Sequence, residues 1–547
     1  NTANSHRVAE GNGTRENNYA SEEITINGEY RNGGDAYYEG ISKPERELMV
    51  QSFYEGLGFR FEEDGAWEWD VMDDEAARPR IKAVEARQMT TEKVFRLSAP
   101  VFIDCTGDGT LSAMAGADYH VGREAAAEYG EPGAVKKADR VTMGNSILFQ
   151  ARDAGRPVPF IKPAWAYTFT DDDLMGHDKE ITSGYWWVEV GGTVWDTVAD
   201  AEEIRDELLK IVYGIWDHIK NGGDHGADTL ALEWVGFLPG KRESRRVLGD
   251  YVLREQDLLA GRVFPDAVGY GGWHIDSHPP ERFRCIAAKT EESEDLPVHL
   301  PGLYTIPYRS LYARGVENLL LGGRIISATH RAFASTRVMG TCAVLAQAAG
   351  TAAAWAAERG VTPRELGADV AALQQRLLRD DCYIPGVRNE DPDDLARGAA
   401  VVCSSGDGAA VIDGVSRITG WVSAPLEGEA PWLELRLPQA GPVGEIRLTF
   451  DSDLSAEIMP SLSDWAQNRQ SPLPPATLVQ DYVITAFLGD RAVHTQTISG
   501  NYQRHRIHAL LAGTVCDRLR VTVLATQGDE RARILEARLY AEAQQKG

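Results

Sequence analysis

Positive charge is scarce in this sequence. The 547 residues include 56 Lys and Arg against 82 Asp and Glu, which leaves a formal net charge of −26. A surface of this charge repels a phosphate backbone unless its basic residues cluster strongly. We therefore expect no nucleic-acid partner.

Cysteine is also rare, and its spacing lacks a metal-binding pattern. The six cysteines lie far apart, without a CxxC pair or zinc-ligand spacing: Cys105, Cys285, Cys342, Cys382, Cys403 and Cys516. We expect isolated core thiols rather than disulfides, and no metal site.

Long apolar runs are absent. No run approaches the roughly 18 residues that a helix needs to cross a bilayer, so we expect no membrane span.

Residues 1–23 lack the basic start and apolar centre of a secretory signal. The location stays open between cytoplasm and export. Because the chain begins with Asn1 rather than Met, we expect that an upstream segment has been removed.

The first strongly patterned region is residues 80–104. They alternate apolar and polar residues and end in "VFID", which predicts a hairpin that leads into a buried strand. Gly107 and Gly109 suit a tight turn, and "TLSAMAGA" has the small residues of a helix packed closely on a sheet. The pattern predicts a strand, a glycine turn and a helix.

The middle and the end of the chain have different periods. In "DAEEIRDELLKIVYGIWDHIKN" the residues Ile204, Leu208, Ile211 and Ile215 fall on one face of a helix. After residue 396 short alternating segments such as "GEIRLTF", "YVITAFL" and "RLRVTVLAT" predict an antiparallel β-sandwich.

A small-residue helix is predicted over 336–356. Ser335 or Thr336 can cap it, and its free N–H groups suit the electron-rich edge of a flavin or a phosphate. The alternative is an Ala-rich helix that only packs on a sheet.

Three motifs occur in one order: "VFIDCTGDGTLSAMAGADYHVGRE", "GFLPGKRESRRVLGDYVL" and "GGRIISATHRAFASTRVMGTCAVLAQAAGTAAA". Together they resemble the FAD-dependent oxidoreductase family whose members are often encoded beside polysaccharide-degrading enzymes. The resemblance covers roughly residues 80–360. It implies FAD as the cofactor. The GxGxxG unit that binds the FAD pyrophosphate is missing before residue 80.

The fold class that follows is an α/β (α+β) flavoprotein-like domain with a substrate-domain insertion, followed by an all-β jelly-roll sandwich that resembles galactose-binding-like, discoidin-type domains. The expected divisions are a partly disordered segment at 1–79, FAD-binding parts at 80–150 and 311–395, a substrate domain at 151–310 and the sandwich at 396–547.

The resemblance also implies the cofactor site. Its expected residues along the flavin and its diphosphate are Gly323, Arg324, Ser327, Arg337 and Val338, and those expected to close the turn near it are Thr106, Gly107 and Asp108. For the arginines, surface or ion-pairing roles are the alternative.

Substrate and catalytic residues are expected near these motifs. The planar fork of arginine can hold the vicinal oxygens of a sugar, which makes Arg242 and Arg245 candidates, with a solvated charged face as the alternative. The other substrate candidates are Trp186, Trp187 and Trp273, for which packing in the core is the alternative. Oxidation of an alcohol needs a base for the hydroxyl proton, for which the candidates are His330, His274 and His278. His274, Asp276 and His278 alternate, but a metal site would need a further ligand, and structural histidines are the alternative.

Two functions follow. The first is hydride transfer from a carbohydrate or polyol to flavin; the second is a flavin-free homologue or fragment that binds glycans or serves as a structural protein. The expected partners are a small-molecule or glycan substrate, and either a missing N-terminal fragment or a second copy of the chain.

Overall fold

The computed structural model describes residues 78–174, 181–184, 188–222, 225–283, 297–456, 458 and 461–542, together with four short strands within 19–43. In the latter, β1 (Tyr19–Ser21) pairs in parallel with β4 (Ile41–Lys43), and β2 (Thr25–Ile26) pairs with β3 (Glu29–Tyr30). Most of the segment that we expected to be partly disordered, 1–79, lies outside the described residues.

The predicted strand, turn and helix unit is confirmed. β5 (Ala83–Arg87) and β6 (Val94–Ser98) form the hairpin, β7 (Phe102–Asp104) follows, and α3 (Thr110–Met114) begins after the glycine turn. β7 lies in the first family motif and is parallel to β17 (Leu319–Leu321), which directly precedes the last motif. The first and last motifs therefore meet at one sheet.

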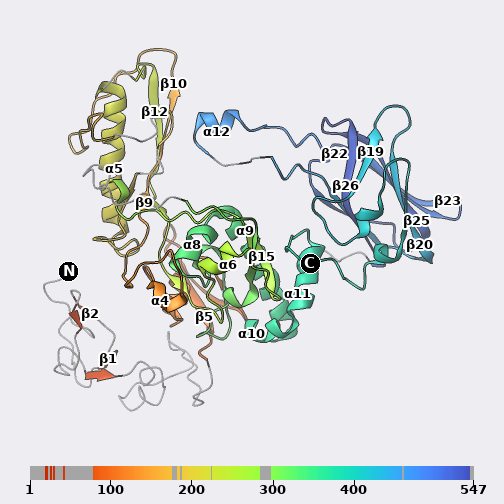
Figure 1. Cartoon of the computed structure of the whole chain (residues 1–547), viewed down its shortest axis with the longest axis horizontal. Coiled ribbons are helices and arrows are strands. Elements are labelled where there is room, and N and C mark those ends of the chain that lie inside the picture. The colour runs from red at the N-terminus through yellow and green to blue at the C-terminus, as the bar shows by residue number, and fades with distance from the viewer. Residues whose placement is uncertain are drawn as a thin grey trace.

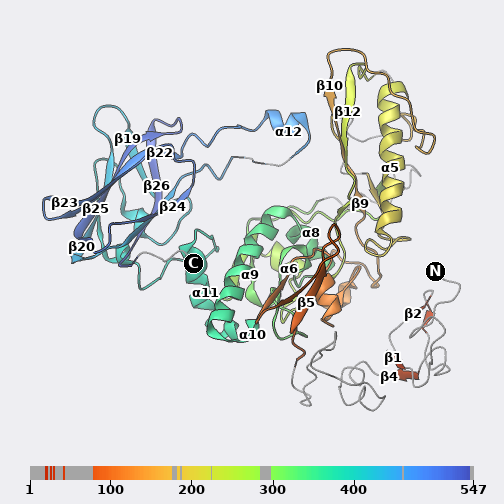
Figure 2. The ribbon, with the colours of Figure 1, turned by 180° about the vertical axis from the view of Figure 1, so that it is seen from behind.

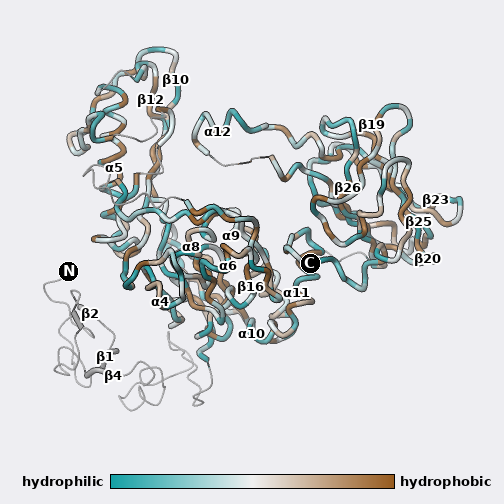
Figure 3. The backbone as a smooth tube through the Cα atoms, in the orientation of Figure 1, coloured by the Kyte–Doolittle hydropathy of each residue, from teal (hydrophilic) through white to brown (hydrophobic). Residues whose placement is uncertain are grey.

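Helices cover this pair of strands and complete its core. α8 (His330–Thr336) and α9 (Met339–Arg359) follow β17, and α9 packs on both strands and on β15. Figure 3 shows hydrophobic residues in the interior of this part of the molecule, beside α9. The other elements here are β8 (Tyr119–His120), α4 (Ala126–Tyr129), β14 (Arg246–Val247), α6 (Glu255–Leu259), β15 (Ala267–Gly271), β16 (Tyr304–Pro307), η2 (Tyr308–Ser310), η3 (Gly323–Ile325), α10 (Pro363–Leu366), η4 (Gly367–Asp369) and α11 (Val370–Arg379).

The amphipathic helix of the middle region is also confirmed. α5 (Ala201–Asp217) buries Ile204, Leu208, Ile211 and Ile215 in a second hydrophobic core. Beside it in Figures 1 and 2 runs the pair β10 (Phe149–Asp153) and β12 (Leu230–Val235). The remaining elements are β9 (Asn145–Ser146), β11 (Glu189–Val190), η1 (His218–Gly222) and β13 (Gly240–Lys241).

The C-terminal part is a sandwich of two antiparallel sheets around a third core. One sheet has the order β18-β20-β25-β22-β23 and the other β19-β26-β21-β24. Its elements are η5 (Leu395–Gly398), β18 (Ala400–Cys403), η6 (Ala409–Ile412), β19 (Trp421–Pro425), β20 (Trp432–Pro442), β21 (Glu445–Phe450), α12 (Asp464–Asn468), β22 (Val479–Leu488), β23 (Arg491–Ile498), β24 (His505–Ala509), β25 (Val515–Thr526) and β26 (Arg531–Tyr540). The alternating pattern after residue 396 therefore predicted the architecture correctly.

Two sequence expectations concern cysteines and membrane spans. The five cysteines within the described residues are free, but Cys105 is exposed, so it is not the core thiol that we expected. Within the described ranges, no helix alone has the length and apolarity of a bilayer span; α8 and α9 pass that test only when joined across a 92° bend.

Candidate functional site

The turn after β7 is held by a buried carboxylate that the sequence analysis missed. Oδ1 of Asp104 accepts hydrogen bonds from the backbone N–H of Thr106 at 2.9 Å and from its hydroxyl at 2.7 Å. Oδ2 accepts from the N–H and hydroxyl of Ser112 in α3, at 2.8 and 2.6 Å. Gly107 has a φ of +78°, and a Cβ there would lie 2.9 Å from Arg324 Nη1. Glycine is required because both the backbone conformation and the close guanidinium exclude a side chain.

Asp108, the next residue, contacts basic side chains from distant segments of the chain. Its carboxylate oxygens lie 2.7 Å from Lys241 Nζ and 2.9 Å from Arg324 Nη2, and its carbonyl accepts from Arg245 Nη1 at 3.0 Å. Burial raises the pKa of Asp108, but the hydrogen bond and charge of Lys241 and the charge of Arg324 outweigh it and hold this pKa below its usual range. We call these four residues the Asp108 cluster. It joins predicted cofactor residues to Arg245, which we had assigned to the substrate.

The helix of the last motif does not begin where we predicted. Ser335 and Thr336 do not cap a helix over 336–356, because they form the end of α8. The chain then turns by 92°, and Val338 is the N-cap of α9. The Ser335 hydroxyl donates instead to the Trp273 carbonyl at 2.6 Å and lies 2.7 Å from the Tyr304 hydroxyl. These hydrogen bonds hold Ser335 in the last turn of α8, which sequence period alone cannot reveal.

The start of α9 is open to a ligand. Val338 provides no side-chain cap for the first N–H groups of the helix. Met339 is 72% exposed, and a Cβ placed on Gly340 would meet nothing within 4 Å. An uncapped helix start carries partial positive charge and unsatisfied donors, which suit an anion or an electron-rich ring edge.

Arg337, at the junction of α8 and α9, belongs to a buried ionic network. Its Nη2 donates to the Asp276 carbonyl at 3.0 Å and lies 3.5 Å from Asp276 Oδ2. His278 lies between two carboxylates, 3.0 Å from Asp276 and 2.7 Å from Glu189, and Arg242 lies 2.7 Å from Glu189. Burial and the charge of Arg242 lower the pKa of Arg337 to about 10. Arg242 and Arg337 are thus interior ion-pairing groups, so Arg242 does not lie on the solvated face that we had weighed against ligand contact; the ligand roles of both arginines stay predictions.

His330 lies in a second buried network. Its Nδ1 is 2.9 Å from Oε1 of Glu243, and Arg246 pairs with the same carboxylate. Glu124 accepts from the His330 backbone N–H at 2.8 Å and lies 2.7 Å from Arg246 Nη2. Burial raises the pKa of Glu243, but the charges of His330 and Arg246 keep it lowered. A carboxylate that holds Nδ1 sets the orientation of the imidazole ring.

His274 is the third candidate base. Its ring lies 4.5 Å from that of Trp273 and 5.6 Å from that of His299, centroid to centroid. Burial lowers the pKa of His274 below 6.5, and the charge of Asp276 opposes this only in part. Trp273 is 45% exposed, whereas Trp186 and Trp187 lie outside the described residues.

The remaining predicted cofactor residues differ in how far they are open to a ligand. Gly323, with a φ of +84°, has open space where a side chain would stand. Ser327 is fully buried, and within the described ranges its hydroxyl has no hydrogen-bond partner. Its cofactor role, like that of Val338, stays a prediction.

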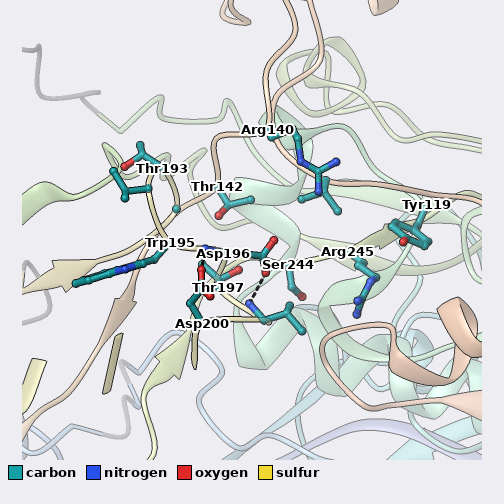
Figure 4. Close-up of a pocket in the computed structure, with 14 residues that line it drawn as sticks. Tyr119, Arg140, Thr142, Thr193, Trp195, Asp196, Thr197, Asp200, Ser244 and Arg245 are labelled. Atoms are coloured by element: carbon teal, nitrogen blue, oxygen red, sulfur yellow. Dashed lines mark hydrogen bonds between the residues drawn. The ribbon is translucent and has the colours of Figure 1, made fainter. Parts of the chain in front are cut away.

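A cavity of about 300 Å³ lies beside the Asp108 cluster. Figure 4 shows Tyr119 and Arg245 on one side and Trp195 on the other, with Arg140 at the edge. The lining is mostly polar: Tyr119, Val121, Arg140, Thr142, Gly192, Thr193, Val194, Trp195, Asp196, Thr197, Val198, Asp200, Ser244 and Arg245. Arg245 and Ser244 connect it to the turn, since the Ser244 hydroxyl donates to the Gly107 carbonyl at 3.3 Å. Such a cavity has the size and chemistry for a small polar ligand.

Comparison with known proteins identifies the family of this chain. The model of the family described as FAD dependent oxidoreductase matches residues 65–377, which is more than half of the chain. The chain therefore belongs to the FAD-dependent oxidoreductase family, and the cofactor that this family implies is FAD. Among curated protein sequences, none matches this chain.

Solved structures with local similarity are small carbohydrate-binding modules. The family 32 module from C. perfringens NanJ, in complex with galactose, is 17% identical, covers 27% of this chain and 98% of its own, and has a TM-score of 0.20. A Streptococcus pneumoniae fucose binding module is 14% identical, with 28% and 99% coverage and a TM-score of 0.21. At these scores the similarity carries no argument about ligands.

Proposed function

We propose that the junction of α8 and α9 holds the isoalloxazine end of FAD, and that the chain oxidises an alcohol carbon of a carbohydrate or polyol. The observation that carries the proposal is the uncapped, open start of α9 with two cations beside it. Burial raises the pKa of Cys342 in the first turn, and the charges of Arg324 and Arg337 both oppose that rise. Both guanidinium groups therefore act on the same end of the helix.

These residues fit the flavin end of the cofactor. Gly323 and Gly340 leave open space, and Nε of Arg324 and of Arg337 is buried without a hydrogen-bond partner within the described part of the chain. Positive charge and helix N–H groups stabilise the negative charge that a reduced flavin ring carries near N1 and O2.

The adenosine end has no counterpart among the described residues. The parallel strands that they contain here are β7 and β17, and β7 pairs on one side only. We propose that a GxGxxG unit on an upstream segment or another polypeptide, or a second copy of the chain, completes the cofactor site.

His274 is the base that we propose for the substrate hydroxyl. When bound, the flavin accepts the hydride from the alcohol carbon, and the hydroxyl proton needs a neutral acceptor. His278 has both ring nitrogens beside carboxylates, and the Nδ1 of His330 is held by Glu243. Burial lowers the pKa of His274, which favours the neutral form of the ring. The carbonyls of Trp273 and Asp276, on either side of His274, accept hydrogen bonds from Ser335 and Arg337. The segment that carries His274 therefore lies against the junction of α8 and α9.

The polar cavity is the proposed substrate site. Hydroxyls of a sugar or polyol find carboxylate and arginine partners there in Asp196, Asp200 and Arg140, and an aromatic face in Trp195. Arg140 is exposed and lines this cavity. Arg140→Ala is expected to raise KM for an accepted polyol without changing kcat, whereas Lys136→Ala, at an exposed residue outside the lining, leaves both unchanged.

The test begins with FAD binding by the chain, followed through quenching of flavin fluorescence. The flavin-loaded protein is then mixed anaerobically with a panel of sugars and polyols, and bleaching of the visible flavin band reports hydride transfer. His274→Gln is expected to slow bleaching by about 10²- to 10⁴-fold with flavin content unchanged. His299→Gln, at the exposed neighbour of His274, is the control. If FAD does not bind even when a GxGxxG unit of a relative is supplied, the flavin-free alternative is correct.

A further inference from the structure

Two histidines and an aspartate meet at the end of α5, far along the chain from the proposed flavin residues. His218 begins η1, where α5 ends, and its side chain is buried. His225 follows on the next loop, and Asp171 lies in a turn closed by the hydrogen bond from Leu174 N–H to the Asp171 carbonyl. No sequence motif joins these three residues.

The three side chains converge on one point. Nε2 of His218 lies 3.2 Å from Oδ1 of Asp171 and 3.1 Å from Nε2 of His225. All three potential ligand atoms lie within 4.8 Å of one another. Nδ1 of His218 is buried and has no hydrogen-bond partner in the described ranges, so the contacts of this ring pass through Nε2.

No placement of protons satisfies both contacts of His218 Nε2 as full hydrogen bonds. An imidazole nitrogen either carries one hydrogen or offers one lone pair in the ring plane. If Nε2 of His218 carries the hydrogen, that single hydrogen is shared between Asp171 and His225. If it offers its lone pair to His225, the same lone pair faces the Asp171 carboxylate. A cation between the three atoms removes the conflict, because all three then act as ligands.

The distances also have the scale of a metal site. Two ligand atoms 2.0 to 2.1 Å from a tetrahedral zinc ion are separated by about 3.3 Å. The two measured contacts of His218, 3.1 and 3.2 Å, are close to this separation. Two imidazoles and a carboxylate are the ligand types of zinc and other first-row transition metals rather than of calcium or magnesium.

We propose that Asp171, His218 and His225 bind one divalent transition-metal ion, zinc in the first instance. The ion ties the turn at Asp171 and the loop at His225 to the end of α5. The Asp171 side chain is 63% exposed, which leaves a coordination position open to water. The nearby loop is already held by Lys220, whose Nζ donates to the carbonyls of Ala227, Asp228 and Leu230. Lys220 therefore holds the backbone on the C-terminal side of His225 to the end of α5. This proposal does not depend on the flavin site.

The experiment is a titration of the untagged, chelator-treated full chain with zinc chloride in a calorimeter. Saturable binding of one ion per chain is expected, together with a rise in melting temperature as zinc is added. His225→Gln and Asp171→Asn are expected to weaken binding by at least about tenfold. Asp172→Asn is the matched control, because Asp172 is the exposed neighbour of Asp171.

Cobalt chloride provides a second measurement. Cobalt(II) bound by two nitrogens and a carboxylate in tetrahedral geometry absorbs visible light more strongly than hydrated cobalt, and His225→Gln is expected to lose that absorption. Circular dichroism establishes that each variant is folded. The proposal fails if zinc does not bind saturably, or if the folded His225→Gln and Asp171→Asn proteins bind it as tightly as Asp172→Asn.

Discussion

Oε1 of Glu243 lies 2.9 Å from Nδ1 of His330, and this carboxylate has no exposed surface. Arg246, also fully buried, pairs with the same carboxylate and with Glu124. Two acidic and two basic groups therefore hold the start of α8 to the segment that follows β13. A buried ionic network of this kind stabilises the fold only while its charges balance.

Substitution of Glu243 by Gln is expected to destabilise the fold strongly. The change removes one charge from a buried network and leaves Arg246 with less compensation, which costs about 3–5 kcal/mol in the free energy of unfolding. Urea unfolding followed by tryptophan fluorescence measures the loss. Glu358→Gln is the control, because the Glu358–Arg376 pair is on the surface, and such pairs contribute under about 1 kcal/mol. Equal stability of the two variants would contradict the role of the network.

Asp276 is expected to make stability depend on pH in acid. Burial opposes ionisation, but the hydrogen bond and charge of His278 and the charge of Arg337 lower the pKa of Asp276 from 3.8 to about 2. Because the folded-state pKa is below the unfolded one, the contribution is complete above about pH 4 and is lost as the pH falls toward 2. It amounts to about 2 kcal/mol. The free energy of unfolding of Asp276→Asn should therefore fall less between about pH 5 and pH 2.5 than that of the wild type. Asp172→Asn should retain the wild-type slope, and an unchanged slope in Asp276→Asn would show that the ion pairs do not persist.

A negative charge at the start of α9 is expected to oppose the flavin. Gly340→Asp places a carboxylate where the helix has open space and tolerates an acidic residue, so the fold is retained. The same charge repels a reduced ring edge, and we expect FAD binding to weaken by roughly fivefold or more, with a lower reduction potential. Gly340→Ala controls for volume, and Ala354→Asp, exposed in the C-terminal half of α9, controls for charge. Equal loss in all three variants would remove the electrostatic argument.

The sandwich is expected to fold better with residues before our predicted boundary at 396. Asp381 lies 2.7 Å from Arg417 and 2.9 Å from Arg504, and the Arg379 carbonyl accepts from the largely buried Arg447 at 2.8 Å. A fragment of residues 396–547 leaves these arginines without those partners, at a cost of about 3 kcal/mol. A fragment of residues 379–547 keeps them. Both should show β-type circular dichroism, the longer one with the higher melting temperature; a reversed order would mean that the linker contacts contribute nothing.

Local pattern predicted much of this fold for physical reasons. α5 and the strands of the sandwich have one buried face, so burial imposes a period on their sequences that can be counted. Gly107 was identifiable because its positive φ excludes most other residues. The glycine turn and the family motifs can therefore be recognised in the sequence.

The ionic networks could not be found in this way. Asp104, Glu189 and Glu243 are isolated acidic residues in the sequence, and each acquires its role from partners that lie from two to about a hundred positions away. The same is true of the start of α9: the sequence continues with helix-compatible residues through Thr336, and the hydrogen bonds of Ser335 with Trp273 and Tyr304 at the end of α8 are seen only in the packed structure.

The sequence by itself determined the family and, through it, the FAD cofactor, because the three motifs that carry the resemblance can be found along one dimension. Tertiary structure alone decided that Asp108 collects Lys241, Arg324 and Arg245, that Arg337 faces Asp276, and that two histidines meet Asp171. Charge pairing depends on distances of a few ångströms between residues far apart in the chain, and only the packed backbone sets those distances.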